Sequence, residues 1–150
     1  MIKRIVIDGN DGTGKTTRLE KMKEIFPDIE FRDRGIFSEM TLVDMLFTQF
    51  EKYDIESYDA YKKKEEFRKT IREDKDTLYI ICRASAEVCQ ERIKMRGDSI
   101  EEEYHTMEDL VKYGKRFDVL IGMVDDLPNV MVVDTDKISS VKKGNSCIRI

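Results

Sequence analysis

The sequence predicts an α/β fold: three layers, α/β/α, around a parallel sheet of four to five strands. Short runs rich in Val and Ile alternate with longer segments whose apolar residues recur at helical spacing. Strands that are separated by helices of this length pair in parallel, and helices then cover both faces of the sheet. No internal repeat or low-complexity linker interrupts the pattern, so we expect one domain over residues 1–150.

The first half of the chain begins with a strand at 2–7 that runs into Asp8 and Gly9. Helical spacing follows from 14 to 26, where Pro27 ends it. A short strand at 29–32 comes next, and two helices follow it at 38–53 and 57–73. Because both strands precede helices, their carboxyl ends should lie at the same edge of the sheet.

The second half repeats this alternation. A strand at 77–82 precedes a helix at 86–96, for which Ser85 is the expected N-cap. Thr106 is the next expected cap, with apolar residues on one helical face up to Gly122, and a strand follows at 129–133. The tail at 146–150 is a candidate edge strand. We expect the strand at 2–7 to lie inside the sheet, between the strands at 29–32 and 78–82.

Composition excludes several kinds of protein. The net charge of -4 argues against non-specific nucleic-acid binding, although 39 % of the residues are charged. No apolar run approaches the ~18 residues that span a membrane, and no signal peptide opens the chain. Three cysteines without a CxxC pair predict reduced thiols and a cytoplasmic protein. With His105 as the one histidine, the chain has few of the residues from which a zinc site or a Ser-His-Asp triad is built.

Residues 9–16 match the Walker A pattern G-x-x-x-x-G-K-[ST]. Its glycines let backbone N–H groups turn towards phosphate oxygens, and the helix that follows presents its N-terminus to the same anion. The pattern predicts that Lys15 contacts the β- and γ-phosphates of ATP and that the Thr16 hydroxyl binds Mg²⁺. The predicted nucleotide-binding residues are Gly9, Asn10, Asp11, Gly12, Thr13, Gly14, Lys15, Thr16 and Thr17.

Three blocks, which cover about half of the chain, resemble the P-loop kinases that include deoxynucleoside and thymidylate kinases. The segment from Ile5 to Thr17 is similar to their phosphate loops, with Asp11 as in the thymidylate kinases. Asp33-Arg34 resembles the Asp/Glu-Arg motif at the end of a neighbouring strand. The segment from Tyr79 to Gly97, followed by three glutamates at 101–103, looks like the strand and lid helix of the deoxynucleoside kinases.

The chain also departs from that family. Lys15 and Asp33 lie close together in the sequence, where the family inserts another strand and helices. Asp98 and Ser99 stand where the nucleoside kinases often carry one more arginine. These differences suggest a shortened form, of the kind that phages encode, with an outer strand and part of the acceptor pocket missing.

The resemblance implies roles for individual residues. Asp8 corresponds to the base that takes the acceptor's proton, although it could instead brace the loop. Asp33 is the other candidate base and could equally hold Mg²⁺ through water, while Arg34 would bind a substrate phosphate or the leaving oxygen. Arg92 and Arg96, one helical turn apart, would contact the transferring phosphate, with a solvated helix face as the alternative for both.

The sequence therefore predicts an ATP- and Mg²⁺-dependent kinase that acts on a small molecule, a deoxynucleoside or its monophosphate. Two alternatives stay open. One is a kinase for a polynucleotide end or a modified DNA base; the other is a nucleotide-binding protein with a degenerate acceptor site. The chain lacks the Asn-Lys-x-Asp motif of GTP-binding switches. The sequence leaves open whether it forms a homodimer.

Overall fold

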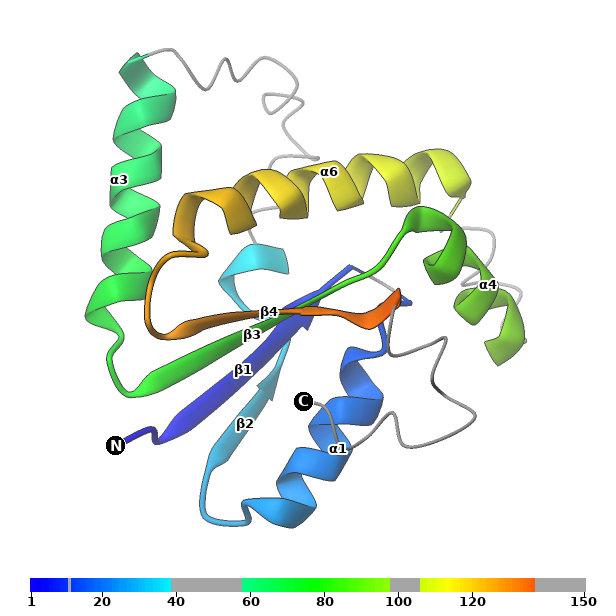
Figure 1. Cartoon of the computed structure of the whole chain (residues 1–150), viewed down its shortest axis with the longest axis horizontal. Coiled ribbons are helices and arrows are strands. Elements are labelled where there is room, and N and C mark those ends of the chain that lie inside the picture. The colour runs from blue at the N-terminus through cyan, green and yellow to red at the C-terminus, as the bar shows by residue number, and fades with distance from the viewer. Residues whose placement is uncertain (11, 39–57, 98–105, 137–150) are drawn as a thin grey trace.

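The structure, a computed structural model, describes residues 1–10, 12–38, 58–97 and 106–136. Its centre is a parallel sheet of four strands in the order β2-β1-β3-β4 (Figure 1). The strands are β1 at Arg4–Gly9, β2 at Glu30–Asp33, β3 at Thr77–Arg83 and β4 at Val130–Asp134. This confirms the expected α/β fold, with the first strand flanked by the second and third.

The helices cover both faces of the sheet. Helix α1 (Lys15–Ile25) lies against one face, and α3 (Tyr58–Glu73) and α6 (Met107–Val124) lie on the other (Figure 1). Helix α4 (Ala86–Arg96) packs beside the first turns of α6. The boundaries agree with the sequence prediction to within about two residues, because the periodic segments fixed them. Among the described residues, no helix is both long and apolar enough to cross a membrane.

Alternation along the strands divides the core between the two faces. Val6, Tyr79 and Ile81 face α3 and α6, where they pack with Phe67, Ile71 and Leu120. The intervening strand residues, Ile5, Ile7, Ile80 and Cys82, face α1 and its buried Leu19. Since both faces are covered, β1 and β3 are apolar on both faces through their central residues, as expected for a parallel sheet.

Two predicted caps define the helices next to the carboxyl edge of the sheet. The Ser85 hydroxyl accepts a hydrogen bond from Val88 N at 3.3 Å, and Thr106 accepts from Asp109 N at 3.2 Å. Gly97 ends α4 in the left-handed conformation, at φ 72°. The helix predicted at 38–53 and the edge strand predicted at 146–150 lie almost entirely outside the described residues.

Phe37 joins the segment after β2 to the core. Its side chain is fully buried and meets Phe67 edge to face, with ring centroids 5.3 Å apart. It also lies against Tyr79, whose hydroxyl donates to Asp74 at 2.6 Å. Burial and the Asp74 carboxylate both raise the pKa of Tyr79, so the ring stays neutral in the core. Phe37 thereby holds the β2 exit against the α3 side of the sheet.

We expect Phe37→Ala to lower the free energy of unfolding by about 3–5 kcal/mol, because the surrounding core can collapse only partly around the missing ring. Urea denaturation followed by circular dichroism would measure this change. Phe26→Ala is the matched control, since that ring is 44 % exposed at the end of α1. Equal effects of the two substitutions would contradict the core position of Phe37.

Candidate functional site

The chain leaves β1 through a loop that has no room for side chains at two of its glycines. Gly9 has φ 150°, and a Cβ there would lie 2.4 Å from the Cys82 carbonyl oxygen. Gly12 has φ 81°, and a Cβ there would lie 2.6 Å from the Cys89 carbonyl oxygen. Only glycine combines a positive φ with such close backbone approach. The loop is therefore a tightly folded backbone turn between the ends of β1 and β3 and helix α4.

The loop is closed internally and leads straight into α1. Thr13 donates to the Asn10 carbonyl from both its backbone N, at 3.3 Å, and its hydroxyl, at 2.7 Å. Asn10 Nδ2 in turn donates to Leu110 O of α6 at 3.2 Å. Gly14 occupies the N-cap of α1 and supplies no side-chain cap. The first N–H groups of α1 therefore receive no side-chain acceptor from the N-cap residue.

Lys15, Thr16 and Thr17 form the first turn of α1, as the pattern predicts. Their side chains, and the whole of Asp11, lie outside the described part of the chain, so their predicted contacts stay predictions. The described glycines at 9 and 12 are required because a Cβ at either position would collide with the Cys82 or Cys89 carbonyl oxygen. Oxygen donors from Thr16 and Asp33 would suit Mg²⁺.

Two arginines hold the outer side of the loop. Arg92 of α4 donates to Gly12 O at 3.1 Å, to Thr135 Oγ1 at 3.0 Å and to Thr135 O at 2.9 Å. Arg18 of α1 is buried and donates to Gly14 O at 3.1 Å. The loop carbonyls at 12 and 14 are thus occupied by side-chain donors. Arg92 has the tethering position at the loop, whereas Arg96 lies exposed at the end of α4.

Asp8 connects the loop to the segment that follows β2. Its side chain is fully buried and accepts from Gly9 N at 2.9 Å, Gly35 N at 2.9 Å, Ser38 N at 3.0 Å and the Ser38 hydroxyl. An ionised carboxylate offers about four acceptor positions, and four donors use them here. This arrangement favours the loop-bracing alternative for Asp8 over the role of a catalytic base.

Asp33 and Arg34 lie where β2 ends, beside the loop. Both side chains are exposed. Arg34 has φ 67°, a left-handed conformation that few residues other than glycine adopt, and its N–H donates to Ile7 O at 2.9 Å. A Cβ at Gly35 would lie 2.6 Å from Val6 Cγ1, so the chain presses directly against β1 at this bend. The structure therefore brings the Asp33-Arg34 pair beside the phosphate loop, as the sequence predicts.

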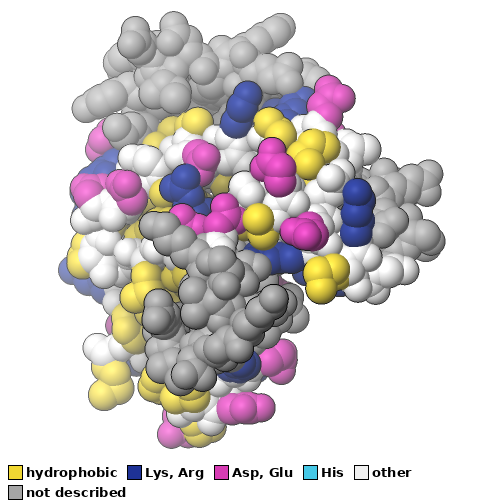
Figure 2. Space-filling view, turned by 45° about the vertical axis from the view of Figure 1, so that its right-hand side comes forward, with side chains coloured by type: hydrophobic (Ala, Val, Ile, Leu, Met, Phe, Trp, Pro, Cys, Tyr) yellow, Lys and Arg dark blue, Asp and Glu magenta, His cyan; other side chains and the backbone are white. Residues whose placement is uncertain are grey.

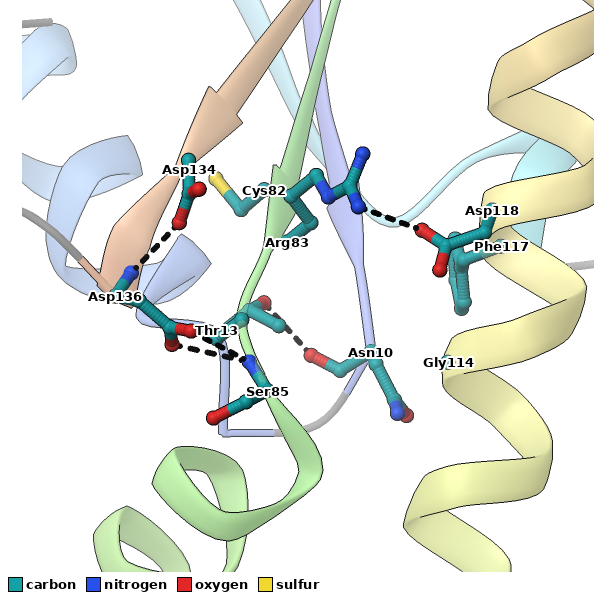
Figure 3. Close-up of a pocket in the computed structure, with 11 residues that line it drawn as sticks. Asn10, Thr13, Cys82, Arg83, Ser85, Gly114, Phe117, Asp118, Asp134 and Asp136 are labelled. Atoms are coloured by element: carbon teal, nitrogen blue, oxygen red, sulfur yellow. Dashed lines mark hydrogen bonds and ion pairs between the residues drawn. The ribbon is translucent and has the colours of Figure 1, made fainter.

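A pocket of about 240 Å³ lies between the loop, the ends of β3 and β4, and α6 (Figure 3). Figure 3 shows Arg83 facing Asp118, at 3.4 Å, and Asp136 accepting from Ser85 N at 3.0 and 3.1 Å. Asp134 accepts from Asp136 N at 3.1 Å. Three carboxylates against one guanidinium disfavour a phosphate here, so we assign the phosphate to the loop. The lining residues are Asn10, Thr13, Cys82, Arg83, Ala84, Ser85, Gly114, Phe117, Asp118, Asp134 and Asp136.

Sequence reasoning missed Arg18 and the Asp136–Ser85 contact. Arg18 follows the motif by two residues, and an arginine on a predicted helix reads as a solvated side chain. Nothing in the sequence indicates that its guanidinium folds back onto Gly14. Asp136 lies two residues beyond the end of β4, in the same edge of the sheet as Arg83. Its position at the carboxyl end of a predicted parallel strand could have indicated that it lies near the site.

The face of the molecule in Figure 2 carries acidic and basic side chains side by side, with hydrophobic atoms between them. On the described part of that face, lysines and arginines do not gather into one stripe. A basic stripe is the usual footprint of a protein that binds a polynucleotide backbone. The described part of this face shows no such footprint.

The fold resembles that of solved structures at low sequence identity. A deoxyadenosine kinase from M. mycoides, solved with bound dCTP, matches with a TM-score of 0.60 at 19 % sequence identity, over 89 % of this chain and 90 % of that one. The chain has a P-loop NTPase fold. An uncharacterized protein from Eubacterium ventriosum matches with a TM-score of 0.38 and 12 % identity, over 99 % and 100 % of the two chains, and we draw no argument from it. No protein-family model matches the chain, and no curated protein does either.

We expect Arg92→Met to lower the free energy of unfolding by about 2–3 kcal/mol, because its guanidinium makes three hydrogen bonds that join α4 to the loop and to Thr135. Urea denaturation would measure the change. Arg96→Met on the same helix is the control, and we expect it to shift stability by less than about 0.5 kcal/mol. A neutral Arg92→Met would show that the tether contributes nothing to the fold.

Proposed function

We propose that this protein is a kinase that transfers the γ-phosphoryl group of ATP, with Mg²⁺, to a deoxynucleoside or a deoxynucleoside monophosphate. One observation carries the proposal. The phosphate loop after β1 and the Asp33-Arg34 bend after β2 lie at one edge of the sheet and share the Asp8 carboxylate. A donor site and a cationic acceptor site are thereby fixed relative to one another, which is the main requirement for phosphoryl transfer.

Each part of this edge has a distinct task in the proposal. The backbone N–H groups of residues 12–16 hold the donor phosphates, and Lys15 adds a positive charge for the β- and γ-phosphates. Thr16 and Asp33 would hold Mg²⁺, which neutralises charge on the phosphate oxygens when it is bound. Arg34 orients the phosphate-bearing end of the acceptor, and Asp11 faces its sugar.

The two arginines of α4 have different roles in the proposal. Arg92 keeps the loop in shape through Gly12 O, so its contribution to the rate is indirect. Arg96 lies one turn later, at the exposed end of the helix. A guanidinium there can bind two oxygens of the transferring group as negative charge redistributes over them. We therefore assign transition-state stabilisation to Arg96.

A panel assay tests the proposal. ADP release would be measured with ATP and Mg²⁺ over the four common deoxynucleosides, their monophosphates and a DNA oligonucleotide with a free 5′ hydroxyl. The proposal requires release that depends on a small-molecule acceptor. Release only with the oligonucleotide would support a polynucleotide kinase. Binding of ATP without release for any acceptor would support a binding protein with a degenerate acceptor site.

We expect Lys15→Ala to lower kcat by at least about 10²-fold, because a positive charge at the transferring phosphate is lost. The free energy of unfolding should change by less than about 1 kcal/mol, since the residue lies in the first turn of α1 and the proposal places its ammonium at the phosphates rather than in the core. Steady-state kinetics and urea denaturation would measure the two effects. Lys23→Ala, on the last turn of the same helix, is the control. Full activity in Lys15→Ala would refute the loop assignment.

Arg96→Ala should lower kcat by roughly 10²-fold and change the KM for ATP much less, because the contact forms mainly in the transition state. Initial rates at varied ATP concentration would separate the two constants. Lys94→Ala serves as the control, since that residue is equally exposed near the end of α4. An unchanged kcat in Arg96→Ala would remove this residue from the catalytic machinery.

A further inference from the structure

We propose that the acceptor is a phosphomonoester, the 5′-phosphate of a nucleoside monophosphate, and that Arg34 binds that phosphate. This inference rests on the proposed function and selects one of its two acceptors. The two acceptors differ in whether the attacking oxygen carries a proton at pH 7. A nucleoside hydroxyl must lose its proton to a base as it attacks. A phosphomonoester has a second pKa near ~6, so at pH 7 its attacking oxygen is mostly unprotonated.

Asp8, the candidate base that the sequence favours, is not positioned to take a proton. Its carboxylate is fully buried, and its acceptor positions are used by Gly9 N, Gly35 N and the N–H and hydroxyl of Ser38. A substrate hydroxyl could reach it only if the turn after β2 came away from β1. That turn is also held by the bond from Arg34 N to Ile7 O.

Asp33 lies on the other side of the sheet from Asp8. It pairs in register with Ile7, and Ile7 packs with Leu19 on the α1 face. Phe31, two residues earlier on β2, packs on that same face. Side chains alternate along a strand, so Asp33 shares this face, whereas Asp8 follows Val6 on the opposite one. Asp33 thus lies on the α1 side of the sheet, where it would serve Mg²⁺ rather than the acceptor.

The remaining carboxylates at this edge of the described chain are also engaged. Asp134 accepts from Asp136 N, and Asp136 accepts from Ser85 N with both oxygens. Both lie beyond β3, on the far side of β1 from Arg34. A nucleoside hydroxyl would need a base beside Arg34, but of the two described carboxylates on the β2 side of the loop, Asp8 has its acceptor positions filled and Asp33 lies on the opposite face of the sheet. An acceptor that carries no proton removes that need.

Arg34 supplies what a phosphate acceptor requires. It adopts φ 67°, a conformation that is unfavourable for a residue with a side chain, and it is held there from both sides. Its own N–H donates to Ile7 O, and the next N–H, that of Gly35, donates to Asp8. A fixed bend thus carries an exposed guanidinium beside the phosphate loop, and a guanidinium fits two phosphate oxygens at once.

The transfer balances without a base. An oxygen of the acceptor phosphate forms a bond to the γ-phosphorus while the bond from that phosphorus to the β,γ-bridging oxygen breaks. ADP leaves with the electron pair of the broken bond, and the acceptor becomes a nucleoside diphosphate. Above pH 8, where all these phosphates are fully ionised, the reaction releases no proton. Phosphorylation of a nucleoside hydroxyl would release one proton for each ADP formed.

The experiment compares the four deoxynucleoside monophosphates with the matching deoxynucleosides. ADP formation and proton release would be recorded together at pH 8.5 with a pH indicator. We expect turnover with at least one monophosphate and with none of the nucleosides, and no proton release from the transfer step. Turnover with a nucleoside, together with one proton for each ADP, would overturn the inference while leaving the kinase proposal intact.

The role of Arg34 is tested by Arg34→Met and Arg34→Lys. We expect Arg34→Met to raise the KM for the monophosphate by roughly 10- to 10²-fold, as for loss of a charged hydrogen-bonding partner, with the KM for ATP changed less than about twofold. Arg34→Lys should restore part of the affinity. Arg32→Met is the control, because that exposed arginine lies on the same strand and pairs with Glu30. A KM unchanged in Arg34→Met would overturn the assigned contact.

Binding without catalysis separates this inference from the proposed function. The thermal shift produced by each monophosphate, in the absence of ATP and Mg²⁺, should be present in the wild type and in Arg32→Met but absent in Arg34→Met. That result supports the inference even if no ADP forms, in which case only the kinase proposal fails. A shift with nucleosides alone, or one that persists in Arg34→Met, counts against it.

Discussion

The buried Asp8 carboxylate is the interaction on which the site depends. It accepts hydrogen bonds from two segments that are far apart in the sequence, the start of the phosphate loop at Gly9 and the turn at Gly35 and Ser38. A buried carboxylate is stable only when donors replace the water that it loses, and here backbone N–H groups supply most of them. The hydrogen bonds that stabilise the Asp8 carboxylate therefore also fix the distance between the loop after β1 and the turn after β2.

The loop after β1 is held by side chains of the neighbouring helices α1 and α4. Arg92 and Arg18 donate to the carbonyls of Gly12 and Gly14. A carbonyl that is bound on the outer side of a turn orients its peptide unit, so the N–H groups of neighbouring units can point inward. Two guanidinium charges close to the loop also favour an anion within it. The same two arginines, Arg18 of α1 and Arg92 of α4, thus orient the peptide units of the loop and add positive charge next to it, and both lie outside the Walker A motif.

The sequence predicted the fold well and the site in part. The strands and helices were predictable because their periodicity and caps, such as Ser85 and Thr106, are local features. The turn between β1 and α1 was predictable because glycines at this spacing between a strand and a helix favour a tight loop. The partners of Asp8 and Arg92 were not, since each depends on segments that the sequence keeps far apart. From the sequence alone, a carboxylate next to Gly9 that faces a substrate cannot be distinguished from one that accepts a hydrogen bond from Gly35 N.

The order of the strands explains why the two sides of the loop differ. Beyond β3, the edge is closed by its own groups: Asp136 binds Ser85 N, and Arg83 pairs with Asp118. Beyond β1, Asp33 and Arg34 are both exposed at the end of β2. The side of the edge that keeps its charged side chains accessible to a ligand is therefore the side that Asp8 ties to the phosphate loop. A cation presented there by a left-handed bend suits an anionic acceptor better than a neutral hydroxyl, and the bond from Arg34 N to Ile7 O helps to hold that bend.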